Sequence, residues 1–364
     1  MLSAAELEDL LLLAHHDEII TDEELVLLLL VLWEDDYEPM FWKKYPRFTI
    51  EQFDNMTDND SVMNFRFSKA DFTKLHNLLD LPEKLTSDSG TTWGSMEGFA
   101  IVLRRLAYPN RLYDLCNLFG RAPSELSVIF NTTCHAIHER WAHLLDDFEK
   151  DWLDEQVAQT YAIATSELSP LDHCIGYVDG TIRRVCRPIR KQRELYNGHK
   201  RVHCLKYQGT ILPSGILTHV YGPFEGRRHD AALMRESGLQ EQLQDLDLRA
   251  QDGAKLHLYG DTAYGLSEQI IVPFQGAQAQ QNPQQREFNK GMSSARESIE
   301  WGFGKISSLW KFVDYSKNQK VLLQPVGVYY RVAALLTNCH TCCYSSQTGM
   351  YFDIEPPTLE QYLS

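Results

Sequence analysis

The sequence predicts an α/β protein whose N-terminal part is helical. Over about the first 165 residues, apolar side chains recur with the spacing of amphipathic helices. From about residue 170 the pattern changes to short apolar runs bounded by turn residues, which is typical of strands. A chain of 364 residues is long enough for several domains. We expect an acidic helical region (1–90), a helical region with a helix-turn-helix-like segment (91–165) and an α/β domain (166–364).

The first region is expected to form short acidic helices. Its apolar-periodic segments are AAELEDLLLLAHH (4–16), EELVLLLLVLW (23–33) and KADFTKLHNLLDL (69–81), with a polar linker expected at 54–62. Residues 1–60 hold 16 acidic and three basic side chains, so they carry most of the net charge of −15. Such a segment is either a solvated helical cap or a docking surface for a basic partner.

The second region contains a helix (96–108) and then a pattern typical of a helix-turn-helix. Gly120 supplies the turn between a first helix and a second one that begins near Pro123. If the second helix entered a DNA groove, the side chains available to read bases would be Glu125, Ser127, Asn131 and Thr132. The alternative is a pair of helices that serves only for packing.

The third region alternates strands and helices. Strands are expected at 173–181, ending at Asp179, at 182–188, and twice within 201–224 around a turn at 213–215. A helix (226–246), a strand (254–265) that ends in Gly-Asp, a glutamine-rich loop (274–291) and a helix (293–312) follow. The tail (351–363) is expected to be a short packing or partner strand.

Two strands that end in aspartate and a helix that carries glutamate can bring three carboxylates together. The residues are Asp179, Asp261 and one of the two glutamates at 297 and 300. Carboxylate oxygens are ligands that Mg²⁺ prefers. A pair of such ions can stabilise the attacking oxygen and the leaving oxygen when a phosphodiester bond is displaced. Each aspartate alone would more often be a turn or cap residue.

A strongly basic stretch follows Asp179 directly. Between Arg183 and Lys206 there are nine basic side chains against one acid, Glu194. Such a patch can neutralise nucleic-acid phosphates, although a solvated basic hairpin would have the same composition.

Other composition signals point to few additional functions. Cys339, His340, Cys342 and Cys343 invite a zinc site, but no second ligand pair follows and the apolar helix around them explains them as core. No uncharged apolar run is long enough to span a membrane, and no basic leader precedes the first helix. We therefore expect an intracellular protein without a membrane segment.

The ordered blocks GYVDGT, GRRHDAALMRES, YGDTAYG, RESIEWGFGKI and VAALLTNCH resemble those of the PIF/Harbinger transposases, a DDE family. The resemblance covers roughly residues 95–364, with 82 residues from Asp179 to Asp261 and 39 from there to Glu300. It implies an RNase H-like catalytic domain in which a mixed sheet is flanked by helices. One departure is that Lys305 comes early and Ser307 stands where the family usually has lysine.

The resemblance implies a metal-dependent active site formed by Asp179, Asp261 and Glu300, with Glu297 as the alternative third acid. These residues would hold Mg²⁺ or Mn²⁺, with two ions per site. DNA phosphates would be bound beside the ions by the basic residues Arg183, Arg184, Arg187, Lys191 and Arg193. His229 and Asp230 match a family block and are expected at the sheet edge or near the site.

The implied function is that of a DNA transposase acting on terminal inverted repeats in the nucleus. Such transposases depend on a separate Myb/SANT-like protein for DNA recognition and nuclear entry, and two transposon ends favour a homo-oligomer. The alternatives are a domesticated descendant that acts as a nuclear interaction or chromatin protein, and an unrelated nuclease on the same fold.

Overall fold

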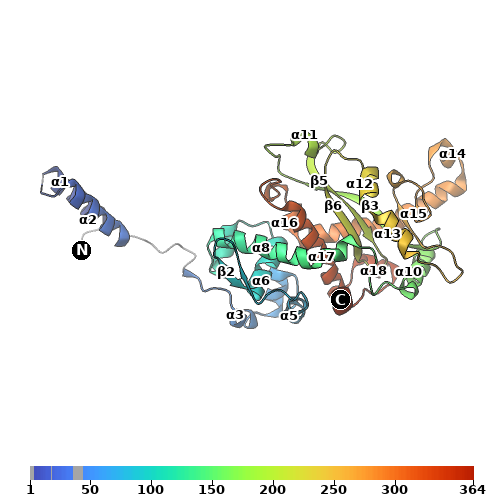
Figure 1. The fold of residues 1–364 in the computed structure, drawn as a ribbon, viewed down its shortest axis with the longest axis horizontal. Helices are drawn as coiled ribbons and strands as arrows, with labels where there is room; N and C mark the ends of the chain where they lie inside the picture. The colour runs from blue at the N-terminus through green and yellow to red at the C-terminus, as the bar shows by residue number, and fades with distance from the viewer. Residues whose placement is uncertain (1–3, 18, 36–43) are drawn as a thin grey trace.

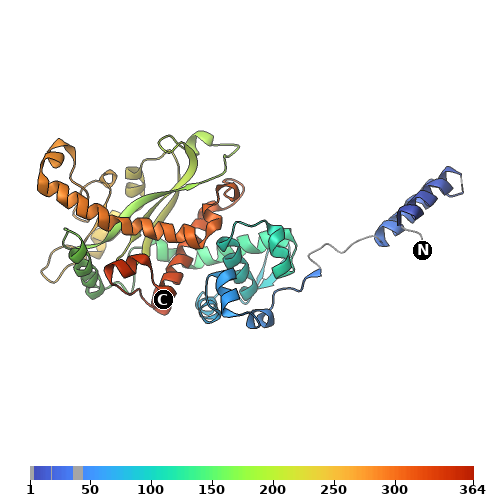
Figure 2. The same cartoon turned by 180° about the vertical axis from the view of Figure 1, so that it is seen from behind.

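The computed structural model describes residues 4–17, 19–35 and 44–364 (Figure 1). Helices α1 (Ala4–His16) and α2 (Asp22–Asp35) form a hairpin that lies apart from the rest of the molecule in both views (Figures 1 and 2). Residues 36–43 of the acidic region lie outside the described residues. Within the ranges given, no helix has the length and apolar character needed to cross a bilayer.

A small helical lobe follows, built around aromatic side chains. Its elements are α3 (Ile50–Asp54), α4 (Asp58–Phe65), α5 (Lys69–Leu78), β1 (Lys84–Thr86), β2 (Thr92–Gly94) and α6 (Ser95–Ala107). Phe72 is central, because its ring lies 4.6 Å from Phe53 and 5.0 Å from Phe99. The polar linker expected at 54–62 is wrong: Thr57 and Asp60 form a reciprocal capping box that begins α4.

The helix-turn-helix-like segment joins this lobe to the α/β domain. It consists of η2 (Leu112–Leu115), α7 (Cys116–Phe119), a left-handed Gly120 and the long helix α8 (Pro123–Trp141), followed by α9 (His143–Asp146). Phe130 of α8 packs 5.0 Å from Tyr329, whose hydroxyl also bonds to Asn131. The geometry therefore serves packing between α8 and α17 (Val326–Tyr344), and base reading by α8 stays a prediction.

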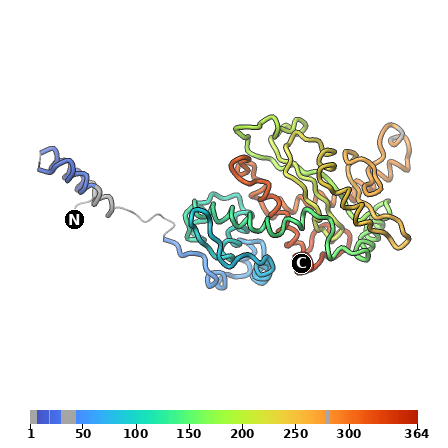
Figure 3. The backbone as a smooth tube through the Cα atoms, in the orientation of Figure 1, coloured from blue at the N-terminus to red at the C-terminus, as the bar shows by residue number. Residues whose placement is uncertain are grey.

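The α/β domain begins with α10 (Glu155–Leu168) and is organised around a mixed sheet (Figure 1), and Figure 3 traces its backbone. Its strands are β3 (Cys174–Arg184), β4 (Tyr196–Asn197), β5 (Val202–Ile211), β6 (Leu217–Glu225), β7 (His257–Gly260) and β8 (Ile270–Ile271). The main path runs β4-β5-β3-β7-β8, and β6 pairs with β5. Pairings of β5 with β3 and β6 are antiparallel, whereas β3, β7 and β8 are parallel.

Helices flank both faces of this sheet. Alternate residues of β3 separate two cores, since Tyr177 packs in one cluster and Val178 in the other. The first cluster includes α15 (Pro283–Leu309) and α17 (Val326–Tyr344), and the second includes α12 (Asp230–Glu236) and α13 (Leu239–Leu246). Shorter elements are α11 (Gln192–Leu195), η3 (Thr262–Tyr264), α14 (Gly276–Gln281), α16 (Lys311–Asp314) and η4 (Ser316–Asn318). This mixed α/β architecture is consistent with an RNase H-like domain.

Strand β3 differs from the expected strand because it does not end at Asp179. It continues to Arg184 because residues 177–184 pair with β5 without interruption, and Asp179 lies opposite Gly209. The Asp-Gly pair has a local preference for a turn, but hydrogen bonding to the neighbouring strand β5 keeps it extended.

Helix α15 lies close to the sheet at two glycines. A Cβ atom on Gly209 would lie 2.7 Å from the ring of Phe303, and one on Gly302 would lie 2.5 Å from Cδ1 of Ile211. The absence of these side chains sets how near α15 approaches β5. The helix also begins earlier than expected, at Pro283, so that α14 and α15 replace much of the predicted glutamine-rich loop.

The C-terminal segment is helical, and the predicted tail strand is wrong. Helices α18 (Gln347–Phe352) and α19 (Leu359–Tyr362) bring Phe352 and Tyr362 into the main core. Cys339 of α17 is fully buried, and burial raises the pKa of Cys342 to about 12, as expected for thiols of a helical core.

Candidate active site

Two of the predicted acids are brought together by the parallel pairing of β3 and β7. Val178 lies beside Gly260 in the register, so the residues that follow, Asp179 and Asp261, leave neighbouring strands at the same level. The side chain of Arg296 joins them: its Nη1 atom lies 3.1 Å from Oδ2 of Asp179 and 4.0 Å from Oδ2 of Asp261. Both carboxylates therefore converge on one cationic atom.

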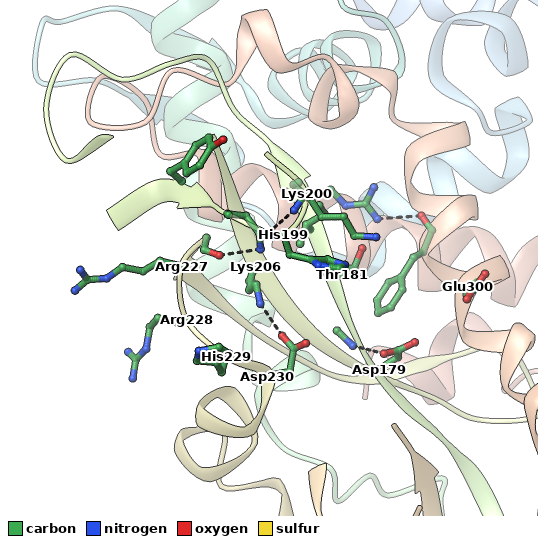
Figure 4. Close-up of a pocket in the computed structure, with 18 of the residues that line it drawn as sticks. Asp179, Thr181, His199, Lys200, Lys206, Arg227, Arg228, His229, Asp230 and Glu300 are labelled. Atoms are coloured by element: carbon green, nitrogen blue, oxygen red, sulfur yellow. Dashed lines mark hydrogen bonds and ion pairs between the residues drawn. The ribbon is translucent and has the colours of Figure 1, made fainter. Parts of the chain in front are cut away.

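Glu300 lies one helical turn after Arg296 on α15. It lines the same cavity as Asp179, and Figure 4 shows both carboxylates on one side of that cavity. Glu297 is also exposed but is not among the residues lining this cavity. The close packing at Gly209 and Gly302 holds α15 at the distance that allows this placement.

The acids influence one another electrostatically. Burial raises the pKa of Asp179, whereas Arg296 and the backbone N–H of Gly180 lower it. Asp261 and Glu300 raise it further, because neighbouring negative charges disfavour ionisation. Arg296 is thus the counter-charge of an otherwise repulsive group of acids.

The donor chemistry of this group fits a hard divalent cation, although the arrangement is not a ready-made metal cluster. Across the described ranges, no three His, Cys, Asp or Glu side chains are arranged to hold a metal ion. The two aspartates nonetheless already converge on a cation, the Arg296 guanidinium, and all three acids offer only oxygen ligands. Asp179, Asp261 and Glu300 are the residues that would hold such an ion.

The cavity beside the acids has a volume of about 920 Å³ and a basic opposite wall. His199 and Lys200 come from the turn before β5, and Arg227, Arg228 and His229 come from the turn after β6 (Figure 4). Lys206 and Asp230 also line this cavity, and they form an ion pair in which Nζ of Lys206 lies 2.9 Å from Oδ1 of Asp230. His229 and Asp230, expected near the site, therefore line the cavity wall.

The predicted DNA-binding residues fall into two groups. Arg183 is buried and does not present a free guanidinium, which differs from the expectation: it donates to the Phe303 carbonyl at 3.3 Å and the Tyr330 hydroxyl at 3.2 Å. The other four predicted residues are exposed: Arg184, Arg187, Lys191 and Arg193. None of these four lines the cavity that contains Asp179.

The departure at positions 305 and 307 also has a structural counterpart. Lys305 is directed away from the cavity, donating to Thr341 Oγ1 at 2.9 Å and to the Ser345 carbonyl at 2.6 Å, and burial lowers its pKa to about 8. Ser307 lines the cavity instead.

Sequence reasoning missed several residues of the site. Tyr264, three positions after Asp261, is buried with a hydroxyl that has no hydrogen-bond partner among the described residues. Burial raises its pKa, and Asp179, Asp230 and Asp261 raise it further. The Arg227-Arg228 pair before His229 and the basic turn at 199–200 were visible signals, but only the folded chain brings them to the acids.

Comparison with known proteins gives a family match for the segment that contains these residues. Residues 178–338 match a family model described as DDE superfamily endonuclease, and the matched segment contains Asp179, Asp261 and Glu300. No curated protein and no solved structure matches the chain. The match supports a DDE transposase-type family and suggests a metal-dependent nuclease that acts on DNA.

Proposed function

We propose that this protein is the catalytic subunit of a PIF/Harbinger-type DNA transposase, which cleaves and joins phosphodiester bonds at terminal inverted repeats. The observation that carries the proposal is the convergence of Asp179 and Asp261 on one cationic atom, with Glu300 on the same cavity. This geometry lies inside the segment that matches a DDE endonuclease model.

In this proposal Asp179, Asp261 and Glu300 hold two Mg²⁺ or Mn²⁺ ions. Bound divalent ions supply charge stabilisation and activation of the attacking and leaving oxygens. The chain itself positions the three carboxylates through β3, β7 and α15, and Arg296 balances their charge in the protein without DNA. Exposed Arg184, Arg187, Lys191 and Arg193 would neutralise phosphates of the bound duplex.

Nicking of DNA that carries the inverted repeats flanking the gene tests this function. The full chain should nick such DNA with Mg²⁺ or Mn²⁺ and not with EDTA, and Asp179→Asn should remove the activity. Equal cleavage by the variant, or no cleavage by the wild type with its partner present, would contradict the proposal.

The α1–α2 hairpin supports a partner-binding role for the acidic region. Its side chains include acids and exposed apolar residues, among them Leu13 and Leu27, 61% and 62% exposed. A basic partner with an apolar groove would cover both kinds of side chain. We propose a Myb/SANT-like protein as that partner and the nucleus as the location, with the transposase acting as a homo-oligomer on two ends.

Deletion of residues 1–43, which removes the α1–α2 hairpin and keeps the helical lobe, tests the partner interface. The shortened protein should lose capture of a Myb/SANT-like partner while retaining metal-dependent nicking of DNA. Unchanged capture would restrict the acidic region to solubility or packing.

A domesticated, non-transposing descendant is the second candidate. It is favoured by Ser307, which lines the cavity where the resembling family carries lysine. The two candidates separate in the nicking experiment: a domesticated protein would bind DNA or chromatin without metal-dependent cleavage, and restoring Ser307→Lys would not create it.

A further inference from the structure

The wall of the cavity that faces the acids is formed by two turns that lie far apart in the sequence. Residues 198–201 connect β4 to β5, and residues 226–229 connect β6 to α12. Lys200 and Arg227 are exposed residues that line this cavity, and Figure 4 shows Arg227 on the side opposite Glu300 with Lys200 between them.

Asn197 ties the two turns together. Its side chain is buried, and its Nδ2 donates to the carbonyl of Gly226 at 2.9 Å. Its Oδ1 accepts from the N–H of Lys200 at 2.8 Å. The N–H of Arg227 is held as well, by the carbonyl of Glu194 at 3.1 Å. The backbone positions of both cationic residues are therefore fixed before any ligand binds.

Gly226 makes this junction possible. A Cβ atom at this position would collide with the carbonyl oxygen of Leu195 and would lie 2.8 Å from the Sγ of Cys204. The turn can approach α11 and β5 this closely only because no side chain is present.

Lys200 and Arg227 differ from the other cations of the cavity because their charges are not used internally. Lys206 is paired with Asp230, and Arg228 is paired with Glu236. In the part of the chain that the structure describes, no acid lies within ion-pair distance of Lys200 or Arg227. Within the described residues, the side-chain charges of Lys200 and Arg227 therefore contribute no ion pair to the fold and remain available to a ligand.

We propose that Lys200 and Arg227 form a phosphate-binding site for the DNA strand that runs through the cavity, with Asn197 as the residue that positions them. The inference rests on the proposed function, because it places the scissile phosphate at Asp179 and Glu300. The neighbouring phosphates of the same strand then lie along the opposite wall, where two cations neutralise them. Arg227 offers a planar guanidinium that suits phosphate oxygens, and Lys200 a mobile point charge.

The salt dependence of DNA binding tests this site. Affinity of the full chain for duplex DNA is measured in Ca²⁺ over a range of salt concentrations. Removing one phosphate contact lowers the slope of log affinity against log salt by about one. We therefore expect Lys200→Ala and Arg227→Ala each to lower the slope by about one, and the double variant by about two.

Two further variants make the test specific. Lys84→Ala removes the same charge from exposed β1, outside the cavity, and should leave the slope unchanged. Asn197→Ala removes no charge but should lower the slope, because both cations lose their fixed positions. An effect of Asn197→Ala on thermal stability alone, with a wild-type slope, would reduce this residue to a structural role.

Binding and cleavage fail separately in this design. Wild-type slopes in folded Lys200→Ala and Arg227→Ala proteins overturn the phosphate site, whatever the protein cleaves. A second outcome is that the two variants show the expected loss of slope but even the wild type cleaves no DNA in Mg²⁺ or Mn²⁺. That outcome would leave the phosphate site intact and contradict the nuclease function instead.

Discussion

Arg296 Nη1 lies 3.1 Å from Oδ2 of Asp179, so the first predicted metal ligand is already paired with a cation supplied by the chain. The same guanidinium reaches toward Asp261. Because Asp261 and Glu300 would otherwise repel the carboxylate of Asp179, this arginine is part of how the site folds. The residues proposed to bind metal ions and their internal counter-charge therefore lie in one place.

Replacement of Arg296 should show whether its positive charge stands in for a metal ion beside the acids. In Arg296→Gln the acids lose their counter-charge, so we expect a metal-free melting temperature lower by roughly 2 °C, given the modest value of partly exposed ion pairs. Mg²⁺ should recover more of the melting temperature than it adds to the wild type. Thermal melts with EDTA and with Mg²⁺ measure both effects.

Arg249→Gln is the matched control, because it breaks an exposed pair with Asp247 and neither residue lines the cavity that contains Asp179. Any decrease in the melting temperature of Arg249→Gln should be the same with EDTA and with Mg²⁺. The same metal response in both variants would contradict the role assigned to Arg296.

The two glutamates of α15 should differ in activity. Glu300→Gln removes a carboxylate that lines the cavity and should lower metal-dependent nicking by at least about 100-fold, as loss of metal-site residues commonly does. Glu297→Gln changes an exposed side chain outside the cavity and should stay near wild type. Single-turnover nicking assays compare them, and the reverse order would assign the third ligand to Glu297.

The approach of α15 to the sheet should control both stability and cleavage. Gly209→Ala places a Cβ 2.7 Å from the Phe303 ring and should cost about 1–3 kcal/mol, as overpacking does, while displacing Glu300. Urea denaturation and nicking rates check the two effects. Phe303→Leu in the same chain should restore part of both losses, because it removes the colliding atoms.

Gly304→Ala is the control on the same helix, since nothing lies within 4 Å of its added Cβ. It should stabilise the protein by up to about 1 kcal/mol through helix propensity. Destabilisation of similar size by Gly304→Ala would mean that the effect of Gly209→Ala is not steric.

A buried histidine predicts how stability depends on pH. Burial lowers the pKa of His219 to about 4, so between pH 6.5 and 4 the unfolded chain binds a proton that the folded chain does not. Stability should therefore fall as the pH falls through this window. In His219→Gln the loss should be smaller by about 1 kcal/mol between pH 6.5 and 5.5, because the unfolded histidine is already half protonated at pH 6.5. Urea denaturation at pH 6.5 and 5.5 measures the unfolding free energy of both proteins. An identical loss in the wild type and in His219→Gln would contradict the lowered pKa of His219.

Local patterns were sufficient to predict the helices α6 and α8 and the strand pair β5–β6. Each has either a continuous apolar period or clear turn residues at its ends. The extension of β3 past Asp179 could not be read, because pairing with β5 decides it. Arg183 is similar: its partners Phe303 and Tyr330 lie more than a hundred residues away, and the basic run around it gives no sign of burial.

The site was predictable as residue types but not as an arrangement. Asp179 and Asp261 stand beside glycine after apolar runs, which is a visible signal, and the register of β3 and β7 brings them level. The ion pair with Arg296 and the union of the two cationic turns by Asn197 depend on side-chain geometry between distant segments. No local period carries that information.

The central position of β3 makes the site sensitive to the phase of a single strand. Successive side chains of β3 alternate between the core shared with α15 and the core shared with α12 and α13. A one-residue insertion or deletion before Asp179 would turn its carboxylate to the other face and Arg183 with it. The number of residues in β3 before Asp179 is therefore as important to the site as the identity of Asp179 itself.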